Sequence, residues 1–191
     1  MAELAPKPAT YADLEAVPPH RVAEIIYGAL VTHPRPSPRH ALAASALGGR
    51  LTPSYQRGDG GPGGWIFMGE PELHFGSNVV VPDIAGWRRE RLPALPTTAY
   101  LETPPDWICE ILSDSTERYD RNAKRLIYGD VGVAYLWLLD PRSRVLEVFQ
   151  LTAGQWLLAA TFAGDDAIRT VPFNDIVFSL GELWPLDPPA E

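Results

Sequence analysis

The chain has 191 residues, of which 46% are hydrophobic and 21% charged. This composition is that of a globular protein with a buried core, and it excludes a disordered or fibrous chain. The formal net charge of −8 argues against a simple nucleic-acid binder with a broad basic surface. Most basic residues nevertheless lie between positions 35 and 125, so a local positive face is compatible with the sequence.

The cysteine content and the N-terminus bear on the cellular compartment. Cys109 is the only cysteine, so no internal disulfide can form, as in proteins of a reducing cytosol. The first ten residues lack the basic-then-apolar layout of a signal peptide, and no stretch approaches the roughly 18 apolar residues of a membrane helix. We therefore expect a cytoplasmic protein without a membrane span.

The N-terminal third shows the signals of a short helix, a hairpin and a longer helix. Thr10 followed by Asp13 is typical of a helix start, and Pro18-Pro19 ends that helix. The expected elements in chain order are a loose tail (1–9), a short helix (10–17), two hairpin strands (22–26 and 29–32) and a helix rich in alanine and leucine (40–51).

The remainder alternates strands with one further helix. A glycine-rich run at 58–64 lacks the Lys-Ser/Thr of a phosphate-binding loop, and we expect a loop near the substrate path. The elements that follow are strands (65–68, 72–75 and 79–87), a proline-rich loop (92–105), a buried strand (107–112), a helix (116–129), strands (134–139 and 145–151), further short strands and a tail (186–191). This order predicts one α/β (α+β) domain over residues 1–191, with a mixed sheet flanked by helices.

Glu110 is the strongest anomaly in the sequence. It lies within the apolar run 107–112, which is typical of a central strand covered on both faces. A buried carboxylate costs several kcal/mol unless a metal ion, a basic side chain or a proton compensates it. The alternative is that Glu110 faces solvent at one edge of the sheet.

Asp83 has a similar setting, because it follows Val79–Pro82 and precedes Ile84 and Trp87. On its own it is equally well explained as a turn aspartate after proline. If the strands carrying Asp83 and Glu110 are neighbours, their carboxylates can share a hard cation such as Mg²⁺, which prefers oxygen ligands. The carbonyl of Ile111 is a candidate for a further oxygen.

Lys124 is the candidate basic residue of this site. In the helix that follows Glu110, residues Tyr119, Ala123, Leu126 and Ile127 form the expected buried stripe. At about 100° per residue, Asp120 falls at the edge of the stripe and Lys124 just beyond it. Helix geometry alone therefore favours a surface lysine paired with Asp120, whereas the functional interpretation has Lys124 reaching the polar end of the sheet.

The sequence also resembles a known family. The strings VPD at 81–83, PPDWICEILSDST at 104–116 and GVAYLWLLDP at 132–141, with Asp120, Lys124 and Tyr128 between them, are similar to the Uma-type putative restriction endonuclease family. EIIYGALV at 24–31 and His40 fit the opening hairpin and helix of that family. The resemblance spans roughly Thr10 to Leu183, and its specific part is the block from Pro104 to Pro141.

The resemblance implies a restriction-endonuclease-like core of the PD-(D/E)xK superfamily. It implies that Asp83 and Glu110 bind Mg²⁺ or Mn²⁺ and that Lys124 completes a catalytic site for hydrolysis of DNA. The residue two positions after Glu110 is Leu112 rather than the lysine of the superfamily pattern, and the family supplies its lysine from the following helix.

Further residues at positions common in the family are accessory candidates, namely Glu24, His40 and Asp120. Glu24 is a candidate for reaching the metal through water, and His40 for a phosphate contact or a proton shuttle. The alternatives are an exposed hairpin glutamate for Glu24 and a helix-surface histidine for His40, and Glu72 on a neighbouring strand is a weaker candidate.

Two functions from different classes remain open. One is a metal-dependent endonuclease acting on DNA, and the other is a catalytically inactive module that binds nucleic acid or protein. The acidic net charge and the displaced lysine favour the second, whereas two acids retained in apolar strands favour the first. Many nucleases of the superfamily dimerise, so a homodimer is also an option, with the strands after Val145 as candidates for its interface.

Overall fold

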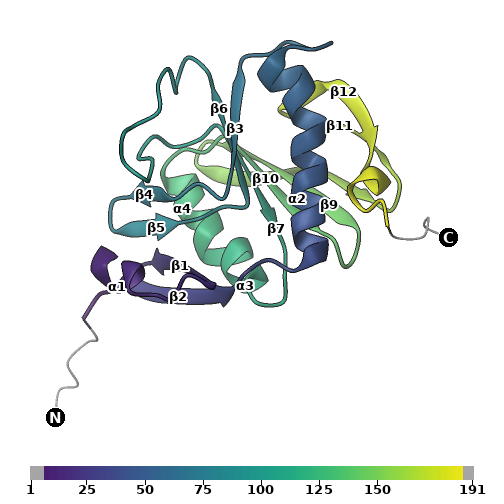
Figure 1. Cartoon of the computed structure of the whole chain (residues 1–191). Coiled ribbons are helices and arrows are strands. Elements are labelled where there is room, and N and C mark those ends of the chain that lie inside the picture. The colour runs from purple at the N-terminus through teal and green to yellow at the C-terminus, as the bar shows by residue number, and fades with distance from the viewer. Residues whose placement is uncertain (1–6, 187–191) are drawn as a thin grey trace.

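A six-stranded mixed sheet forms the centre of the protein, seen here in a computed structural model that describes residues 7–186 (Figure 1). The strand order is β10-β9-β8-β7-β6-β3. Strands β7 (Trp107–Ile111) and β8 (Tyr135–Asp140) run parallel, and every other neighbouring pair is antiparallel. The other members are β3 (Trp65–Gly69), β6 (Ile84–Arg88), β9 (Val145–Thr152) and β10 (Gln155–Ala163).

A second sheet of four strands carries the N-terminal hairpin. Its order is β2-β1-β5-β4. The hairpin turns at Tyr27 and Gly28, whose φ angles of 49° and 79° suit the tight turn that matches strand twist. The members are β1 (Arg21–Ile26), β2 (Ala29–Pro34), β4 (Leu73–Phe75) and β5 (Asn78–Val80). A separate pair, β11 (Ala167–Thr170) and β12 (Phe173–Ser179), follows the main sheet in the sequence.

The single strand expected over residues 79–87 is wrong. The chain ends β5 at Val80 in the four-stranded sheet and begins β6 at Ile84 in the six-stranded sheet. Pro82 has no N–H to donate to a ladder, and it lies in the connection between the two sheets. Asp83 is therefore at the junction of the sheets rather than inside a strand.

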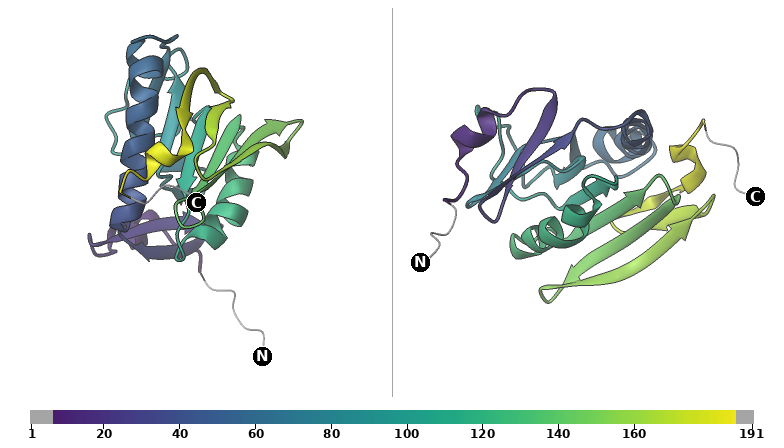
Figure 2. Two further views of the ribbon diagram at one scale, coloured as in Figure 1. Left: turned by 90° about the vertical axis from the view of Figure 1, so that its right-hand side faces the viewer. Right: turned by 90° about the horizontal axis from the view of Figure 1, so that it is seen from below.

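Helices cover both faces of the six-stranded sheet (Figure 2), which confirms the predicted mixed sheet flanked by helices. On one face lies α2 (Pro38–Leu51), which begins at the Ser37 cap and continues into the π-helical turn η1 (Thr52–Arg57). On the other face lies a helix in three parts, α3 (Glu117–Tyr119), the π-helical turn η2 (Asp120–Lys124) and α4 (Arg125–Asp130). The shorter elements are α1 (Tyr11–Glu15) and the 3₁₀ turn η3 (Leu180–Leu183).

The two faces of the sheet bury two separate cores, and β7 contributes to both. Trp107, Cys109 and Ile111 enter the core beneath α2, whereas Ile108 enters the core beneath α3 and α4. This alternation follows from the two-residue period of a strand. Cys109 is fully buried, as the apolar run around it predicts.

Several expectations concern the ends of the chain and the glycine-rich run. The tails expected at 1–9 and 186–191 lie largely outside the described residues, which include only 7–9 and Leu186 of them. The run at 58–64 follows η1, at the opposite end of α2 from His40, and its position near the substrate path stays a prediction. Within residues 7–186, no helix has the length and apolar character needed to cross a bilayer.

Candidate active site

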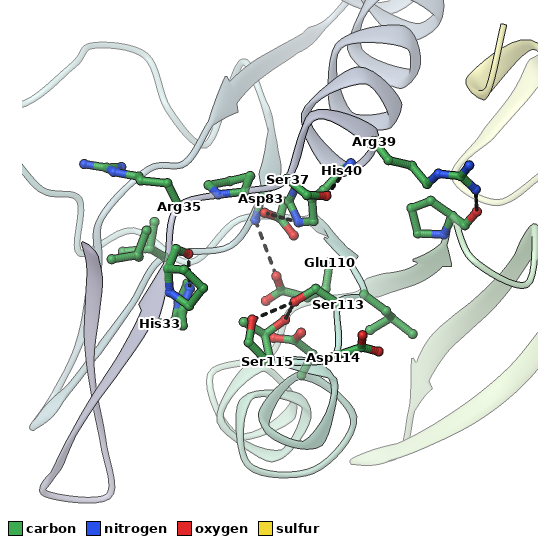
Figure 3. A pocket seen from close by; sticks show the side chains of 18 of the residues that line it. His33, Arg35, Ser37, Arg39, His40, Asp83, Glu110, Ser113, Asp114 and Ser115 are labelled. Atoms are coloured by element: carbon green, nitrogen blue, oxygen red, sulfur yellow. Dashed lines mark hydrogen bonds and ion pairs between the residues drawn. The ribbon is translucent and has the colours of Figure 1, made fainter. Parts of the chain in front are cut away.

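Asp83 and Glu110 meet where β6 begins and β7 ends. The antiparallel register pairs Ile84 with Cys109, which places Asp83 opposite Glu110. The Asp83 amide donates to Glu110 Oε2 at 3.4 Å, and the Ile111 amide donates to Asp83 Oδ2 at 2.7 Å. Both side chains line one cavity of about 410 Å³ (Figure 3). The structure thus brings together the two acids that the sequence singled out.

Glu110 is buried and compensated by other side chains. It is 1% exposed, and its Oε1 lies 2.9 Å from Lys124 Nζ and accepts a hydrogen bond of 2.5 Å from the Tyr128 hydroxyl. Burial raises the pKa of Glu110 well above its ordinary value, and the Lys124 ammonium opposes that rise. The alternative of a solvent-facing Glu110 is therefore wrong.

Lys124 is the centre of a buried ionic cluster. Its ammonium is 3% exposed and lies within ion-pair distance of three carboxylates. Burial by itself would lower the pKa of Lys124, but these carboxylates outweigh it and hold the pKa well above its ordinary value. The distances from Nζ are 2.9 Å to Glu110, 3.1 Å to Glu24 and 3.2 Å to Asp120.

The π-helical turn η2 explains why helix geometry misplaced Lys124. Its hydrogen bonds span one residue more than those of an α-helix, so the fixed rotation of about 100° per residue does not hold from Asp120 to Lys124. Asp120 and Lys124 pair as expected, but they do so inside the protein and not on its surface. Leu126, expected in the buried stripe, is 57% exposed, whereas Ile127 is buried as predicted.

Glu24 connects the two sheets at the site. It lies on β1, is 2% exposed, and its Oε1 accepts a hydrogen bond of 2.8 Å from the Val81 amide. Burial would raise its pKa, but Lys124, His33 and the Val81 amide together lower it to about 2. Glu24 thus contacts both the Val81 amide and Lys124, and so fixes the 81–83 connection beside Lys124. The alternative of an exposed hairpin glutamate is wrong.

His40 approaches Asp83 from the first turns of α2. Its Nε2 lies 3.1 Å from Asp83 Oδ1, and its side chain also hydrogen-bonds to the backbone of Ile111. Burial lowers the pKa of His40, but Asp83 and the Ile111 backbone outweigh burial and raise it. His40 is therefore a buried partner of Asp83 and not a helix-surface histidine.

Acidic side chains outnumber basic ones in this cluster. Four carboxyl groups, those of Glu24, Asp83, Glu110 and Asp120, accompany the single ammonium of Lys124, an excess of three acids when the histidines are set aside. Asp120 Oδ1 lies 3.2 Å from Lys124 Nζ, and burial raises the pKa of Asp120, as it raises that of Glu110. A divalent cation would remove most of this excess.

The donors present fit a hard cation such as Mg²⁺. Asp83 and Glu110 offer carboxylate oxygens, and Ile111 offers a main-chain carbonyl, the ligand types that Mg²⁺ combines with water. Among residues 7–186, no three His, Cys, Asp or Glu side chains are arranged to hold an ion by themselves. A cation at this site would therefore take two side chains, the main chain and water.

Tyr128 belongs to the site, whereas Glu72 does not. Tyr128 was not among the predicted site residues, although its position four residues after Lys124 places both on one side of α4. Glu72, a weaker candidate, lies in a different cluster, where it accepts hydrogen bonds of 2.8 Å from Tyr11 and from His74.

Three arginines surround the mouth of the cavity. Figure 3 shows Arg35 and Arg39 pointing to opposite sides of it. Arg35 lies 3.9 Å from the Glu70 carboxylate, and Arg39 donates to the Pro141 carbonyl at 3.4 Å. Arg142 is bound by carboxylates of Asp114, Glu117 and Asp140. Two of the three positive charges at the mouth, those of Arg35 and Arg142, thus lie beside carboxylates of the protein.

Comparisons with known proteins give a family match and a solved structure of similar fold. A family model named Uma2 and described as "Putative restriction endonuclease" matches residues 8–180. A similar solved structure is a crystal structure described as a putative nuclease belonging to DUF820 from Anabaena variabilis ATCC 29413, with 22% identity. The similarity covers 93% of this chain and 98% of that chain with a TM-score of 0.75, which shows a shared fold. A comparison with curated proteins gives no match.

Proposed function

The chain belongs to the Uma2 family of putative restriction endonucleases, and from this nuclease-like membership we propose that it is a metal-dependent endonuclease that hydrolyses phosphodiester bonds of DNA. The observation that carries the proposal is the buried excess of carboxylates around Lys124, at the point where Asp83 and Glu110 share one cavity. A purely structural role gives no reason to bury three acids against one base and to place a fourth, Asp83, beside them.

In the proposed mechanism, Asp83 and Glu110 would hold Mg²⁺ or Mn²⁺, with the Ile111 carbonyl as the candidate further ligand. Such an ion would polarise the phosphate and lower the pKa of a water molecule. The water oxygen bonds to phosphorus, the P–O ester bond breaks, and the two water protons end on the phosphate and on the released hydroxyl group.

The other residues of the cluster position these groups. The raised pKa of Lys124 keeps it protonated, so it acts as a fixed positive charge near the phosphate and not as a general base. Tyr128 and Lys124 fix the Glu110 carboxylate, and Glu24 fixes the 81–83 connection. His40 orients Asp83 and is close enough to the cavity to exchange a proton.

Cleavage of supercoiled plasmid, which exposes transiently unpaired segments, and of single-stranded circular DNA in Mg²⁺ and Mn²⁺ tests the proposal. We expect cleavage by the wild type, and a loss of roughly 10²-fold or more in Asp83→Asn, because the substitution removes a metal-binding charge. Glu90→Ala is the matched control, since Glu90 is an exposed acid on a loop. Calorimetric titration with Mn²⁺ supplies a readout independent of turnover, and Asp83→Asn should weaken that binding as well.

The inactive module remains the second candidate function. The net charge of −8 and the arginines already paired at the cavity mouth favour it. It predicts that wild type and Asp83→Asn behave alike with DNA and that neither binds Mn²⁺ in the cavity. Such a result would replace the enzymatic proposal.

We also propose that a homodimer forms through β10. This strand is an edge of the six-stranded sheet and carries no charged residue from Gln155 to Ala163. Leu157 and Leu158 are 52% and 55% exposed, and an uncharged, apolar edge strand is a template for pairing. Thr161→Lys should convert a dimer into a monomer in analytical ultracentrifugation, and a monomeric wild type would refute the dimer.

A further inference from the structure

A second cavity of about 610 Å³ extends from the candidate active site along α2. It runs between α2 and the edge strand β3, with Ala44, Ser45 and Gly48 on the helix side and Phe67 and Met68 on the strand side. We call this cavity the α2–β3 groove. Its volume lies within the range of roughly 300–1,000 Å³ that is typical of small-molecule sites.

The groove is continuous with the proposed catalytic cavity. Both are lined by His40 and Asp83, with Arg35 and Glu70 at the same junction. His40 lies at this junction and is 9% exposed. A ligand whose reacting group lies over Asp83 therefore has a second compartment directly beside that group.

The walls of the groove suit a planar, partly apolar group. The helix presents small side chains at positions 41, 44, 45 and 48, and a side-chain β-carbon added at Gly48 would meet no atom within 4 Å. Across from it stands the half-buried Phe67 ring, which packs on the α2 side of the sheet. Aromatic and apolar side chains next to polar groups are the surfaces on which nucleobases stack.

The burial of the proposed catalytic groups limits how a substrate can reach them. The side chains of Glu110 and Lys124 are 1% and 3% exposed, and that of Asp83 is 18% exposed. A duplex is stiff and carries its phosphates on the outside of a rod, so it suits an open basic surface and not a cavity. Of the three arginines at the mouth, Arg35 and Arg142 already lie beside carboxylates, which weakens their attraction for duplex phosphates.

We propose that the α2–β3 groove binds the unstacked nucleotide next to the scissile phosphate, so that the enzyme acts on single-stranded segments or frayed ends and not on intact duplex. This inference rests on the proposed nuclease function and adds its substrate class. The scissile phosphate lies over Asp83 and Glu110, and the adjoining base occupies the groove between Gly48 and Phe67.

Fluorescence anisotropy with a short labelled oligothymidylate, compared with a blunt duplex of mixed sequence, tests the inference. In EDTA, without cleavage, the wild type should bind the single strand at least about tenfold more tightly, the scale of one stacked base. Gly48→Leu should weaken single-strand binding by about the same factor because it fills the groove. Gly49→Leu is the matched control, since Gly49 is helical, exposed, equally unhindered and absent from the groove lining.

Both leucines replace a helical glycine, so both variants should unfold at or above the wild-type temperature. Equal wild-type affinity for single strand and duplex, or an unchanged affinity in Gly48→Leu, would overturn the inference even if plasmid is cut. If no nucleic acid is cut in Mg²⁺ or Mn²⁺ but the Gly48-dependent preference persists, the groove stands as a single-strand site and the proposed catalytic function fails.

Discussion

The two faces of strand β7 are buried to the same degree but in opposite chemical surroundings. Towards α2, Trp107 and Cys109 enter a core of apolar and aromatic side chains. Towards α4, Glu110 enters a cluster of charged and hydroxyl groups between Ile108 and Leu112. On the α2 side, each buried apolar contact stabilises the fold. On the α4 side, burying the charged groups costs desolvation free energy, which apolar residues in the same positions would avoid.

The comparison predicts that the α2 face of β7 determines stability and that the ionic cluster on its α4 face determines the proposed activity. Substitutions on the α2 face should lower the free energy of unfolding and leave the activity of the folded molecules unchanged. Substitutions in the ionic cluster on the α4 face should lower the activity, and should affect stability only as far as they leave charges unpaired. The predictions below test that division, in order of decreasing expected effect.

The largest effect is expected from Trp107→Ala. Trp107 is fully buried and packs edge-on against Trp137, Phe67 and Phe173, so its loss should lower the free energy of unfolding by about 3–5 kcal/mol in urea denaturation. Trp107→Phe should cost much less, because the buried indole N–H has no acceptor to lose. A loss of activity beyond the unfolded fraction would contradict the division between the faces.

Lys124→Met should cost about 3 kcal/mol of stability at neutral pH, because it leaves three buried carboxylates without their cation. The destabilisation should shrink as the pH falls, since burial already raises the pKa of Glu110 and of Asp120 and favours their neutral forms. DNA cleavage should also be lost. Arg118→Met, an exposed residue of the same helix, is the control, and equal unfolding curves for the two variants would refute the prediction.

Tyr128→Phe removes the hydroxyl that donates to Glu110 but keeps the ring in the core. We expect a loss of about 1–2 kcal/mol in stability and a roughly tenfold lower cleavage rate, because Glu110 is held less firmly. Unfolding curves and initial rates measured on the same preparation separate the two effects. A rate equal to that of the wild type would place Tyr128 outside the catalytic machinery.

The smallest effect is expected from Arg121→Ala on the outer side of η2. Arg121 pairs with Glu117 and with Glu147, and the three side chains are partly exposed. Exposed ion pairs of this kind contribute about 0.2–1 kcal/mol, so the midpoint of urea unfolding should shift only slightly and cleavage should not change. A larger loss of activity would mean that the outer side of this helix also contributes to the site.

Local patterns in the sequence predict most strands of the six-stranded sheet. The apolar run around Glu110 identifies β7 and its burial, and the alternation after Val145 identifies β9. The four-stranded sheet is not visible in this way, because β1 pairs with β5 through residues as far apart as Ile25 and Val79. Such pairing depends on tertiary contacts that no local pattern contains.

For the site, residue types and their apolar surroundings indicate Asp83 and Glu110, but not the complete arrangement. Glu24 lies on a hairpin strand whose buried face cannot be read from its own sequence. The position of Lys124 depends on η2, and a helical wheel assumes that every turn is an α-turn. The family resemblance identifies Lys124 as a site residue, whereas helix geometry places it on the surface.

The wide turn η2 gives this helix one residue more than an ordinary α-turn needs. Deleting one residue between Asp120 and Lys124 would restore an ordinary α-turn and leave the later side chains close to their present directions, because a π-turn spans one residue more than an α-turn over the same rotation. Tyr128 would then still face Glu110. A deletion of the exposed Asn122 should therefore be tolerated better than a deletion of Leu126 inside α4, which would rotate Tyr128 by about 100°.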